Sequence, residues 1–186
     1  MEYERARIHP GTSGEIGVSA QSTGWFFAVP DAAAAGVILN GRLDGRLGYS
    51  PNGWLSLGLQ GGIVRGYSTG TDWKGDYYSA DAYPYIKVGI PRLSVKLSAG
   101  YSFTFRENGK PSVHDKFPNA YADFLVGFGE REHSTVVVRL GGTPIAGIGV
   151  GYIFHAGGLS IAGMVSGIPY IVGGHVGLHI GAAYGF

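Results

Sequence analysis

The stretch GGHVGLHIGAAYGF, residues 173–186, alternates strictly between two kinds of side chain. One parity is apolar or aromatic: Val176, Leu178, Ile180, Ala182, Tyr184 and Phe186. The other parity carries only glycine, alanine and histidine. Alternation of period two is typical of a β-strand with two different faces. A strand exposed to water usually has charged residues on its polar face, and this stretch has none.

The scarcity of charge extends well beyond this strand. Residues 140–186 contain no Asp, Glu, Lys or Arg, and glycine occurs there too often for helices. Charged residues make up 15 % of the whole chain, against about 25 % in ordinary soluble domains. This region therefore predicts uncharged strands joined by turns, and lipid is the solvent that accepts an uncharged outer face.

Composition also excludes several classes of protein. A length of 186 residues suits one domain, and a net charge of +1 argues against a nucleic-acid partner. The absence of cysteine excludes disulfides and thiolate metal sites. No run of eighteen apolar residues predicts a transmembrane helix. Residues 1–20 are charged and lack the apolar core of a signal peptide.

The same alternation recurs along the chain and predicts ten strands. It is clearest in residues 93–106, where Leu, Val, Ala, Tyr and Phe oppose Ser, Lys, Gly, Thr and Arg. About 9–11 residues of a tilted strand are enough to cross a bilayer. The predicted strands are residues 14–22, 36–50, 54–62, 77–90, 93–106, 119–129, 135–140, 146–155, 159–167 and 173–186.

The links between these strands alternate in length. TGWFFAVPDAAAA, GYSTGTDWKGD, ENGKPSVHDKFP and IPYIVGGH are long, GGTPI is intermediate, and SPNG, PR, EREH and AGG are short. Outer-membrane barrels have short periplasmic turns and longer outer loops, and an even strand number places both termini in the periplasm. The fold class predicted is all-β: a transmembrane antiparallel up-and-down β-barrel of ten strands, with eight or twelve as alternatives. The barrel would span residues 14–186, and residues 1–13 would form a periplasmic or lumen-plugging segment.

With these features the chain resembles the small outer-membrane β-barrel proteins of Gram-negative bacteria. Its last strand is similar to the C-terminal assembly signal of that family, which ends in Phe or Trp and is read by the barrel-insertion machinery. The matching positions are Val176, Leu178, Ile180, Tyr184 and Phe186. The resemblance implies a location in the bacterial outer membrane. It also implies outer-membrane lipid, lipopolysaccharide and the insertion machinery as partners, with other envelope proteins as further candidates.

A soluble barrel with its apolar parity turned inward is the main alternative fold. In that arrangement glycine would form much of the water-facing side of the eighth and tenth strands. Soluble sheets usually defend such a face with charge, so the membrane barrel is favoured.

The inward parity of the membrane barrel predicts a charge network in the lumen. Its members are Arg42, Asp44, Arg46, Asp81, Lys87, Lys96, Arg106 and Asp123. Because a buried carboxylate without a cation is costly, each aspartate is expected to contact Arg or Lys. Strands eight to ten offer mainly glycine, alanine, serine, histidine and Met164, and tyrosine rings from the other wall are expected to lean onto them. The alternatives are a ligand site, a narrow pore, or a plug formed by residues 1–13.

Candidate catalytic groups are few. Outer-membrane enzymes that deacylate or palmitoylate lipid A use serine and histidine, which must converge within hydrogen-bonding distance. His133 and Ser134 are adjacent and should point apart, whereas His155 and Ser160 lie across a hairpin. Ser112, His114 and Asp115 cluster in a long link. Such clusters are common in polar loops, so we expect no catalytic residues.

Metal and cofactor sites are not expected either. His175 and His179 share a strand face but lie about 13 Å apart, too far for one ion. Asp72 and Asp76 supply few oxygen ligands for calcium. The expected function is a non-enzymatic outer-membrane barrel with a structural, scaffold or accessory role, such as a subunit of a larger envelope complex. A narrow channel or carrier for small solutes and a lipid A-modifying enzyme are the alternatives.

Overall fold

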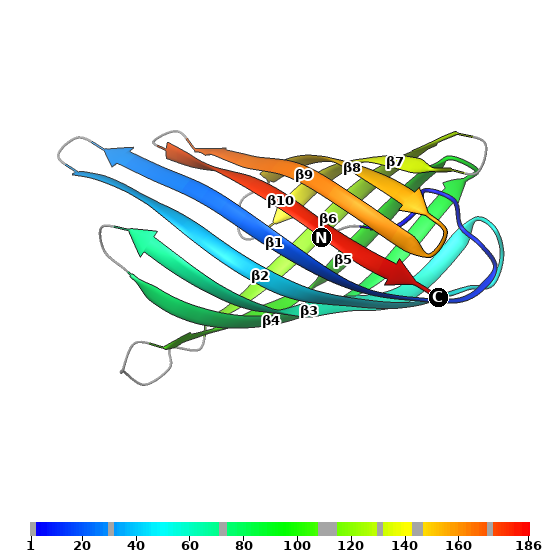
Figure 1. Ribbon diagram of the computed structural model, residues 1–186, viewed down its shortest axis with the longest axis horizontal. Helices are drawn as coiled ribbons and strands as arrows, with labels where there is room; N and C mark the ends of the chain where they lie inside the picture. Colours follow the sequence, from blue (N-terminus) through cyan, green and yellow to red (C-terminus); the bar gives the residue numbers. More distant parts are fainter. Residues whose placement is uncertain are drawn as a thin grey trace.

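The computed structural model describes residues 3–29, 32–70, 74–107, 115–129, 132–142, 147–170 and 173–186. These residues form ten strands that close into one antiparallel barrel (Figure 1). The strands are β1 Gly11–Val29, β2 Ala32–Ser50, β3 Leu55–Gly70, β4 Gly75–Ile90, β5 Leu93–Glu107, β6 Asp115–Phe128, β7 Ser134–Gly142, β8 Gly147–Ala156, β9 Leu159–Tyr170 and β10 Gly173–Gly185. Each strand pairs with its chain neighbours, and β1 pairs with β10. The predicted ten-strand up-and-down barrel is confirmed.

The closing pair joins the two ends of the chain. The register places Ile16 opposite Tyr184 and Ser22 opposite Leu178. Gly14 and Phe186 extend the pairing, because the amide of each donates to the carbonyl of the other at 2.8 and 2.9 Å. Closure therefore leaves neither β1 nor β10 as a sheet edge.

The strands are longer than the sequence predicted, and the links predicted to be long are wrong in length. Only residues 71–74 separate β3 from β4, 108–114 separate β5 from β6, and 171–172 separate β9 from β10. The ladder between β1 and β2 continues through Phe26–Ala35 to Val29–Ala32, so only residues 30–31 separate the two strands. The alanines and glycines in this link resemble loop residues locally, but pairing with the neighbouring strand overrides that preference. The wall is tallest at β1 and β2, with 19 residues each, and lowest at β7, with 9.

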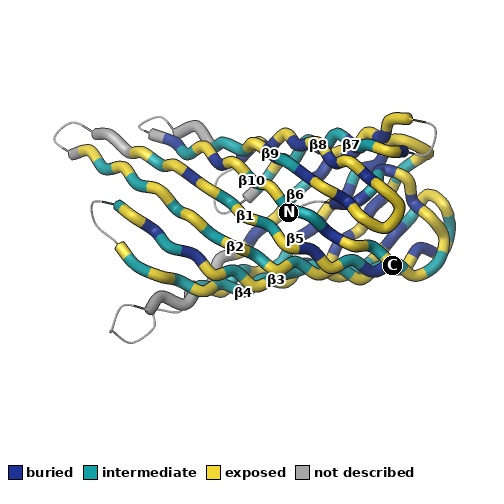
Figure 2. Tube along the Cα trace, viewed as in Figure 1, coloured by how far each residue is buried: buried dark blue, intermediate teal, exposed yellow. Residues whose placement is uncertain are grey.

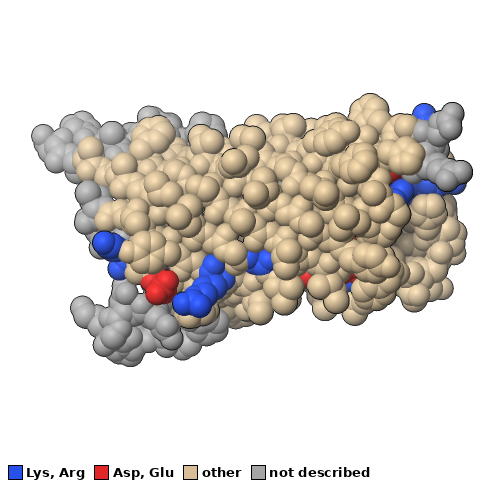
Figure 3. Space-filling view, in the orientation of Figure 1, with Lys and Arg blue, Asp and Glu red and all other residues tan. Residues whose placement is uncertain are grey.

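Side chains alternate between the outside and the lumen along every strand (Figure 2). The predicted apolar parity faces out: Leu39, Leu97 and Leu178 are 53 %, 52 % and 55 % exposed. On the face shown in Figure 3, a broad uncharged area covers β1, β8, β9 and β10. This arrangement is the reverse of a soluble barrel, in which the apolar parity lines the interior. No helix in the described ranges is long and apolar enough to cross a membrane.

Residues 3–10, which precede β1, lie inside the barrel. β1 begins at Gly11, three residues earlier than predicted, and we call residues 3–10 the N-terminal segment. In Figure 1 the blue chain turns back at the end that carries the predicted short turns, residues 51–54, 91–92, 129–133 and 157–158, and runs within the outline of the barrel. Tyr3 and Ala6 are 1 % and 0 % exposed. The N-terminal segment therefore occupies the lumen at the short-turn end.

Candidate functional site

Three cations of the barrel wall converge on one carboxylate of the N-terminal segment. Glu4 Oε1 lies 2.8 Å from Arg46 Nη1 and 3.0 Å from Lys87 Nζ. Glu4 Oε2 lies 3.7 Å from Lys96 Nζ. The cations come from β2, β4 and β5, and both lysines are almost completely buried. We call Arg46, Lys87 and Lys96 the cation seat.

The sequence predicted only part of the cation seat and its partner. The three cations were predicted as members of the lumen network, but Glu4 was not. A charged residue in a short leading segment gives no periodic signal, so only its placement by the fold shows its role. Because buried charges need partners, Glu4 explains how Lys87 and Lys96 can be buried side by side.

The opposite side of the N-terminal segment packs on an apolar patch. Tyr3 and Ala6 share a buried cluster with inward side chains of β6–β10: Leu125, Val137, Ile153, Ala162, Met164 and Ala183. The Tyr3 hydroxyl donates to the Val18 carbonyl at 3.0 Å and lies against the backbone of Gly181. The sequence carried a signal for this patch that the prediction missed, namely large apolar residues on the lumen parity of β6, β7 and β8.

The end of the N-terminal segment is tied to two short turns. The Arg7 amide donates to Glu132 Oε1 at 2.9 Å, and Glu132 is buried. The Arg5 guanidinium donates to the Gly157 carbonyl at 3.0 Å. The N-terminal segment is thus held by charge, apolar packing and hydrogen bonds together.

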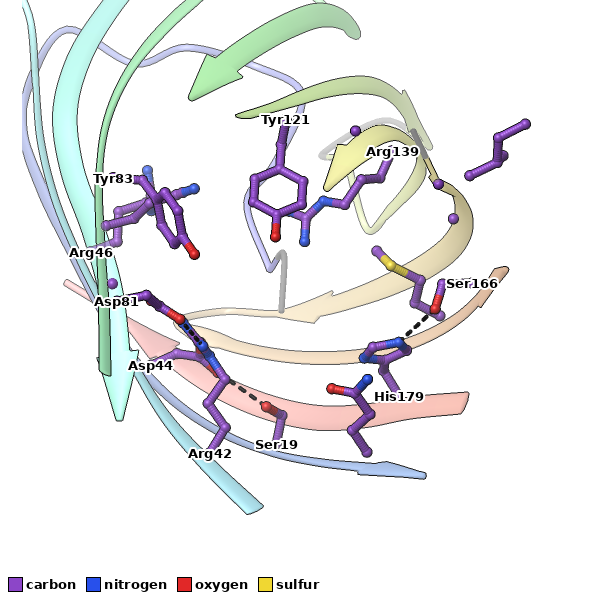
Figure 4. Close-up of a pocket in the computed structure, with 18 of the residues that line it drawn as sticks. Ser19, Arg42, Asp44, Arg46, Asp81, Tyr83, Tyr121, Arg139, Ser166 and His179 are labelled. Carbon is purple, nitrogen blue, oxygen red and sulfur yellow. Dashed lines mark hydrogen bonds and ion pairs between the residues drawn. The ribbon is translucent and has the colours of Figure 1, made fainter. Parts of the chain in front are cut away.

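A second charge cluster lies on the wall formed by β2 and β4. Arg42 forms ion pairs with Asp44 and Asp81, and its Nη2 lies 2.8 Å from Asp81 Oδ1. The Ser19 hydroxyl donates to Asp44 at 3.1 Å. Figure 4 shows this chain of contacts on one side of the lumen. One guanidinium therefore forms ion pairs with two carboxylates.

The third predicted aspartate contacts a residue outside the predicted network. Arg139 of β7 makes two hydrogen bonds to Asp123 of β6, at 2.6 and 3.0 Å. Lys96 Nζ lies 3.8 Å from the same carboxylate, which is fully buried. Glu15 was also absent from the prediction and lies 3.3 Å from Arg46. The side chain of Arg106 lies outside the described residues.

A cavity of about 350 Å³ occupies the lumen away from the short turns. One side is charged and aromatic, with Arg42, Asp81, Tyr83, Tyr121 and Arg139. The other side has glycines of β8 and β9 together with Met164, Ser166 and His179. In Figure 4, His179 and Ser166 lie across the lumen from Arg42 and Asp81. The interior is therefore plugged at one end and hollow at the other.

The expectation that wall tyrosines lean onto the glycines of β8–β10 is wrong. Tyr83 and Tyr121 pack edge to face with ring centroids 5.7 Å apart, and the Arg139 guanidinium lies 5.0 Å from the Tyr121 ring. Tyr85 lies over the glycines of its own side, Gly48 and Gly58. A ring packs most easily on the backbone of the strand next to it, and among β8–β10 Met164 fills part of the space over β8.

Gly58→Ala is expected to destabilise the barrel by about 1–3 kcal/mol, because a β-carbon there would lie 2.6 Å from the Tyr85 ring and against the Leu47 carbonyl. The matched control is Gly41→Ala, since no atom lies within 4 Å of a β-carbon at that outward position. Urea unfolding in detergent micelles measures both. Equal losses would show that the close fit of Tyr85 is not responsible.

Among the candidate serine–histidine pairs, only His155 and Ser160 contact each other within the described residues. His155 Nδ1 lies 2.8 Å from Ser160 Oγ, and Nε2 lies 3.0 Å from Thr135 Oγ1. Both ring nitrogens thus contact hydroxyls, and the ring is 1 % exposed, so the three residues form a cross-strand bridge from β7 to β9. His133 is exposed. Ser112, His114 and the side chain of Asp115 lie outside the described residues.

The histidines of β10 line the cavity wall. His179 Nε2 lies 2.8 Å from Ser166 Oγ, and His175 lies further along the same face. Asp72 lies outside the described residues, and Asp76 is exposed on the outer surface of β4. Within the described parts of the chain, no group of three His, Cys, Asp or Glu side chains could hold a metal ion.

Comparison with known proteins shows a likeness of fold. No protein-family model and no curated sequence matches the chain. Among solved structures, the translocator domain of the autotransporter NalP from Neisseria meningitidis aligns with a TM-score of 0.52 and 9 % identity, over 95 % of this chain and 89 % of that one. The KdgM porin in complex with disordered oligogalacturonate aligns at 0.49 and 11 % identity, over 94 % and 99 %. Ail, the attachment invasion locus protein of Yersinia pestis, aligns at 0.38 and 17 %, over 96 % and 100 %.

Proposed function

We propose that this chain is an integral β-barrel of a bacterial outer membrane with a structural or accessory role, and that its lumen is closed at rest. The observation that carries the proposal is the distribution of side chains. Large apolar residues of all ten strands face out, while the ion pairs of Asp44, Asp81 and Asp123 lie inside. In water this arrangement would expose apolar surface on every side, whereas in lipid both faces are satisfied.

The closed lumen supports a structural role and argues against free diffusion of solutes through the barrel. The N-terminal segment fills the short-turn end with a buried ion-pair cluster and an apolar core. We propose that this end faces the periplasm, because β1 begins and β10 ends there, and a barrel with an even number of strands places both ends on the periplasmic side. Reading of the last strand by the insertion machinery stays a prediction, as do contacts with lipopolysaccharide and other envelope proteins.

The test is whether the chain behaves as a folded membrane barrel. Expressed with an export signal, it should fractionate with the outer membrane. On a gel it should migrate differently before and after boiling, because a closed barrel resists unfolding by detergent at room temperature. Recovery of the folded chain from the soluble fraction without detergent would contradict the proposal. Identical mobility of boiled and unboiled samples would do so as well.

A narrow channel or carrier is the second candidate, and the cavity of about 350 Å³ favours it. A cavity of this size lies within the range of small-molecule sites, and it carries both charged and aromatic groups. If the barrel is a channel or carrier, a small polar solute would enter from the end opposite the short turns. The N-terminal segment would then decide whether the solute can pass through.

A further inference from the structure

The cation seat resembles a ligand-binding site in which a side chain of the same protein, Glu4, takes the place of the ligand. Two oxygens of one carboxylate meet three cations that come from three different strands. Such convergence is typical of sites that bind a carboxylate or another compact oxyanion, because charge-assisted bonds are short and strong. Glu4 occupies the place that the anion would take.

Lys87 depends most on the N-terminal segment. Both acceptors that it has in the described structure come from there: Glu4 Oε1 at 3.0 Å and the Arg5 carbonyl at 2.6 Å. Arg46 and Lys96 also contact wall residues, Glu15 and Gln60 respectively. Withdrawal of Glu4 would therefore leave the Lys87 ammonium facing a vacated lumen.

The vacated wall at the cation seat would carry more positive than negative charge. Arg46, Lys87, Lys96 and Arg139 would face Glu15 and Asp123, with Glu132 at the rim beside the β6–β7 turn. Further along the lumen Arg42 lies between Asp44 and Asp81, so the positive excess is confined to the cation seat, where it favours a bound anion. The same lumen already accommodates the N-terminal segment with the Tyr3 ring, so its removal opens space for small hydrated ions.

The connection to β1 provides a pivot. The N-terminal segment ends at Pro10, and Gly11 follows with φ of 111°, a left-handed conformation that favours glycine. Rotation at this glycine moves residues 3–10 out past the short turns and disturbs only the terminal Gly11–Ser50 pair of the β1–β2 ladder.

We propose that the cation seat is an anion-binding site, that Glu4 is its built-in competitor, and that release of the N-terminal segment turns the closed barrel into a passage for small ions. The ligand class is the small carboxylates and comparable oxyanions. The conduction part rests on the proposed membrane location. The binding part does not, because it can be measured in detergent micelles.

The first experiment asks whether Glu4 holds the N-terminal segment in place. Because the chain has no cysteine, Ala6→Cys introduces a single thiol at a buried position. With Glu4→Lys added, repulsion from three cations should raise the rate of maleimide labelling at least about tenfold. His9→Lys is the matched control, since it adds positive charge at an exposed position of the same segment. Labelling that stays slow in the folded Glu4→Lys protein would overturn the proposal.

The second experiment measures conduction in planar bilayers under a potassium chloride gradient. The parent chain and His9→Lys should remain closed. Glu4→Lys should show discrete conductance steps, because the lumen then opens to small ions. A Glu4→Lys protein that is labelled by maleimide but shows no conductance would overturn the passage.

The third experiment measures binding in micelles and separates this proposal from the proposed function. Acetate and succinate should compete with Glu4 for the cation seat and therefore speed maleimide labelling of the Ala6→Cys thiol. A second readout is slower acylation of Lys87 in the Glu4→Gln protein when either anion is present. No protection at any concentration would overturn the anion site while leaving the membrane barrel intact. Failure of the gel and fractionation test would instead overturn the barrel function and leave the anion site standing.

Discussion

Leu178→Arg is expected to cost about 2–4 kcal/mol in the free energy of unfolding from a lipid bilayer. Leu178 lies near the middle of β10, 55 % exposed, opposite Ser22 of β1 and Val165 of β9. If the outer surface faces hydrocarbon, the guanidinium must leave water or distort the membrane. A cost of this size would reduce the amount of folded barrel severely.

The matched variant is His179→Arg, one residue along the same strand. His179 points into the lumen and lines the cavity of about 350 Å³, where polar groups are available. We expect a loss well below that of Leu178→Arg. Urea titrations of both proteins folded into lipid vesicles give the comparison. Similar losses for the two variants would mean that the two faces of β10 have been assigned incorrectly.

The strands could be predicted because lipid imposes a simple rule on them. Outward positions of a transmembrane strand that face hydrocarbon are mostly apolar, so the period of two survives even where glycine weakens the other face. Residues 93–106 illustrate this: Leu97 and Tyr101 lie outside, while Lys96 and Ser98 lie inside. Closure between β1 and β10 followed from the need to remove sheet edges.

The lumen could be predicted only in part, because its contacts join residues that are far apart in the chain. Parity placed Arg42, Asp44 and Asp81 on the same face, and the barrel brings them into one cluster. Parity could not show that Glu4 would meet Lys87, 83 positions away. Nor could it show that the apolar side chains of Leu125 and Val137 would cover Tyr3.

Strand ends were the least predictable feature of the barrel. Glycine, proline and small residues read as turns when each segment is considered alone. In the barrel, the neighbouring strand supplies hydrogen-bond partners, as in the pairing of Phe26 with Ala35 and of Ile38 with Ser68. The length of a strand is therefore a property of the pair and not of one segment.

Asp123→Leu is expected to destabilise the barrel by about 3–5 kcal/mol, because it removes the shared carboxylate between two cations. Asp123 is fully buried, accepts two hydrogen bonds from Arg139 and lies 3.8 Å from the buried Lys96. Without it, the wall between β5 and β7 would hold two positive charges close together. Urea unfolding in micelles measures the loss.

Two further variants show whether stranded charge is the cause. Asp44→Leu removes a carboxylate whose partner Arg42 keeps a second ion pair with Asp81, so its loss should be clearly smaller. The triple variant Asp123→Leu, Lys96→Met and Arg139→Met removes the whole cluster and should regain most of the stability, because no unpaired charge remains buried there. If the triple variant were as unstable as Asp123→Leu alone, the loss would come from packing at β6 and not from charge. In that case the ion pairs of the lumen would help to fix which residues pair between neighbouring strands, but would contribute little to the free energy of unfolding.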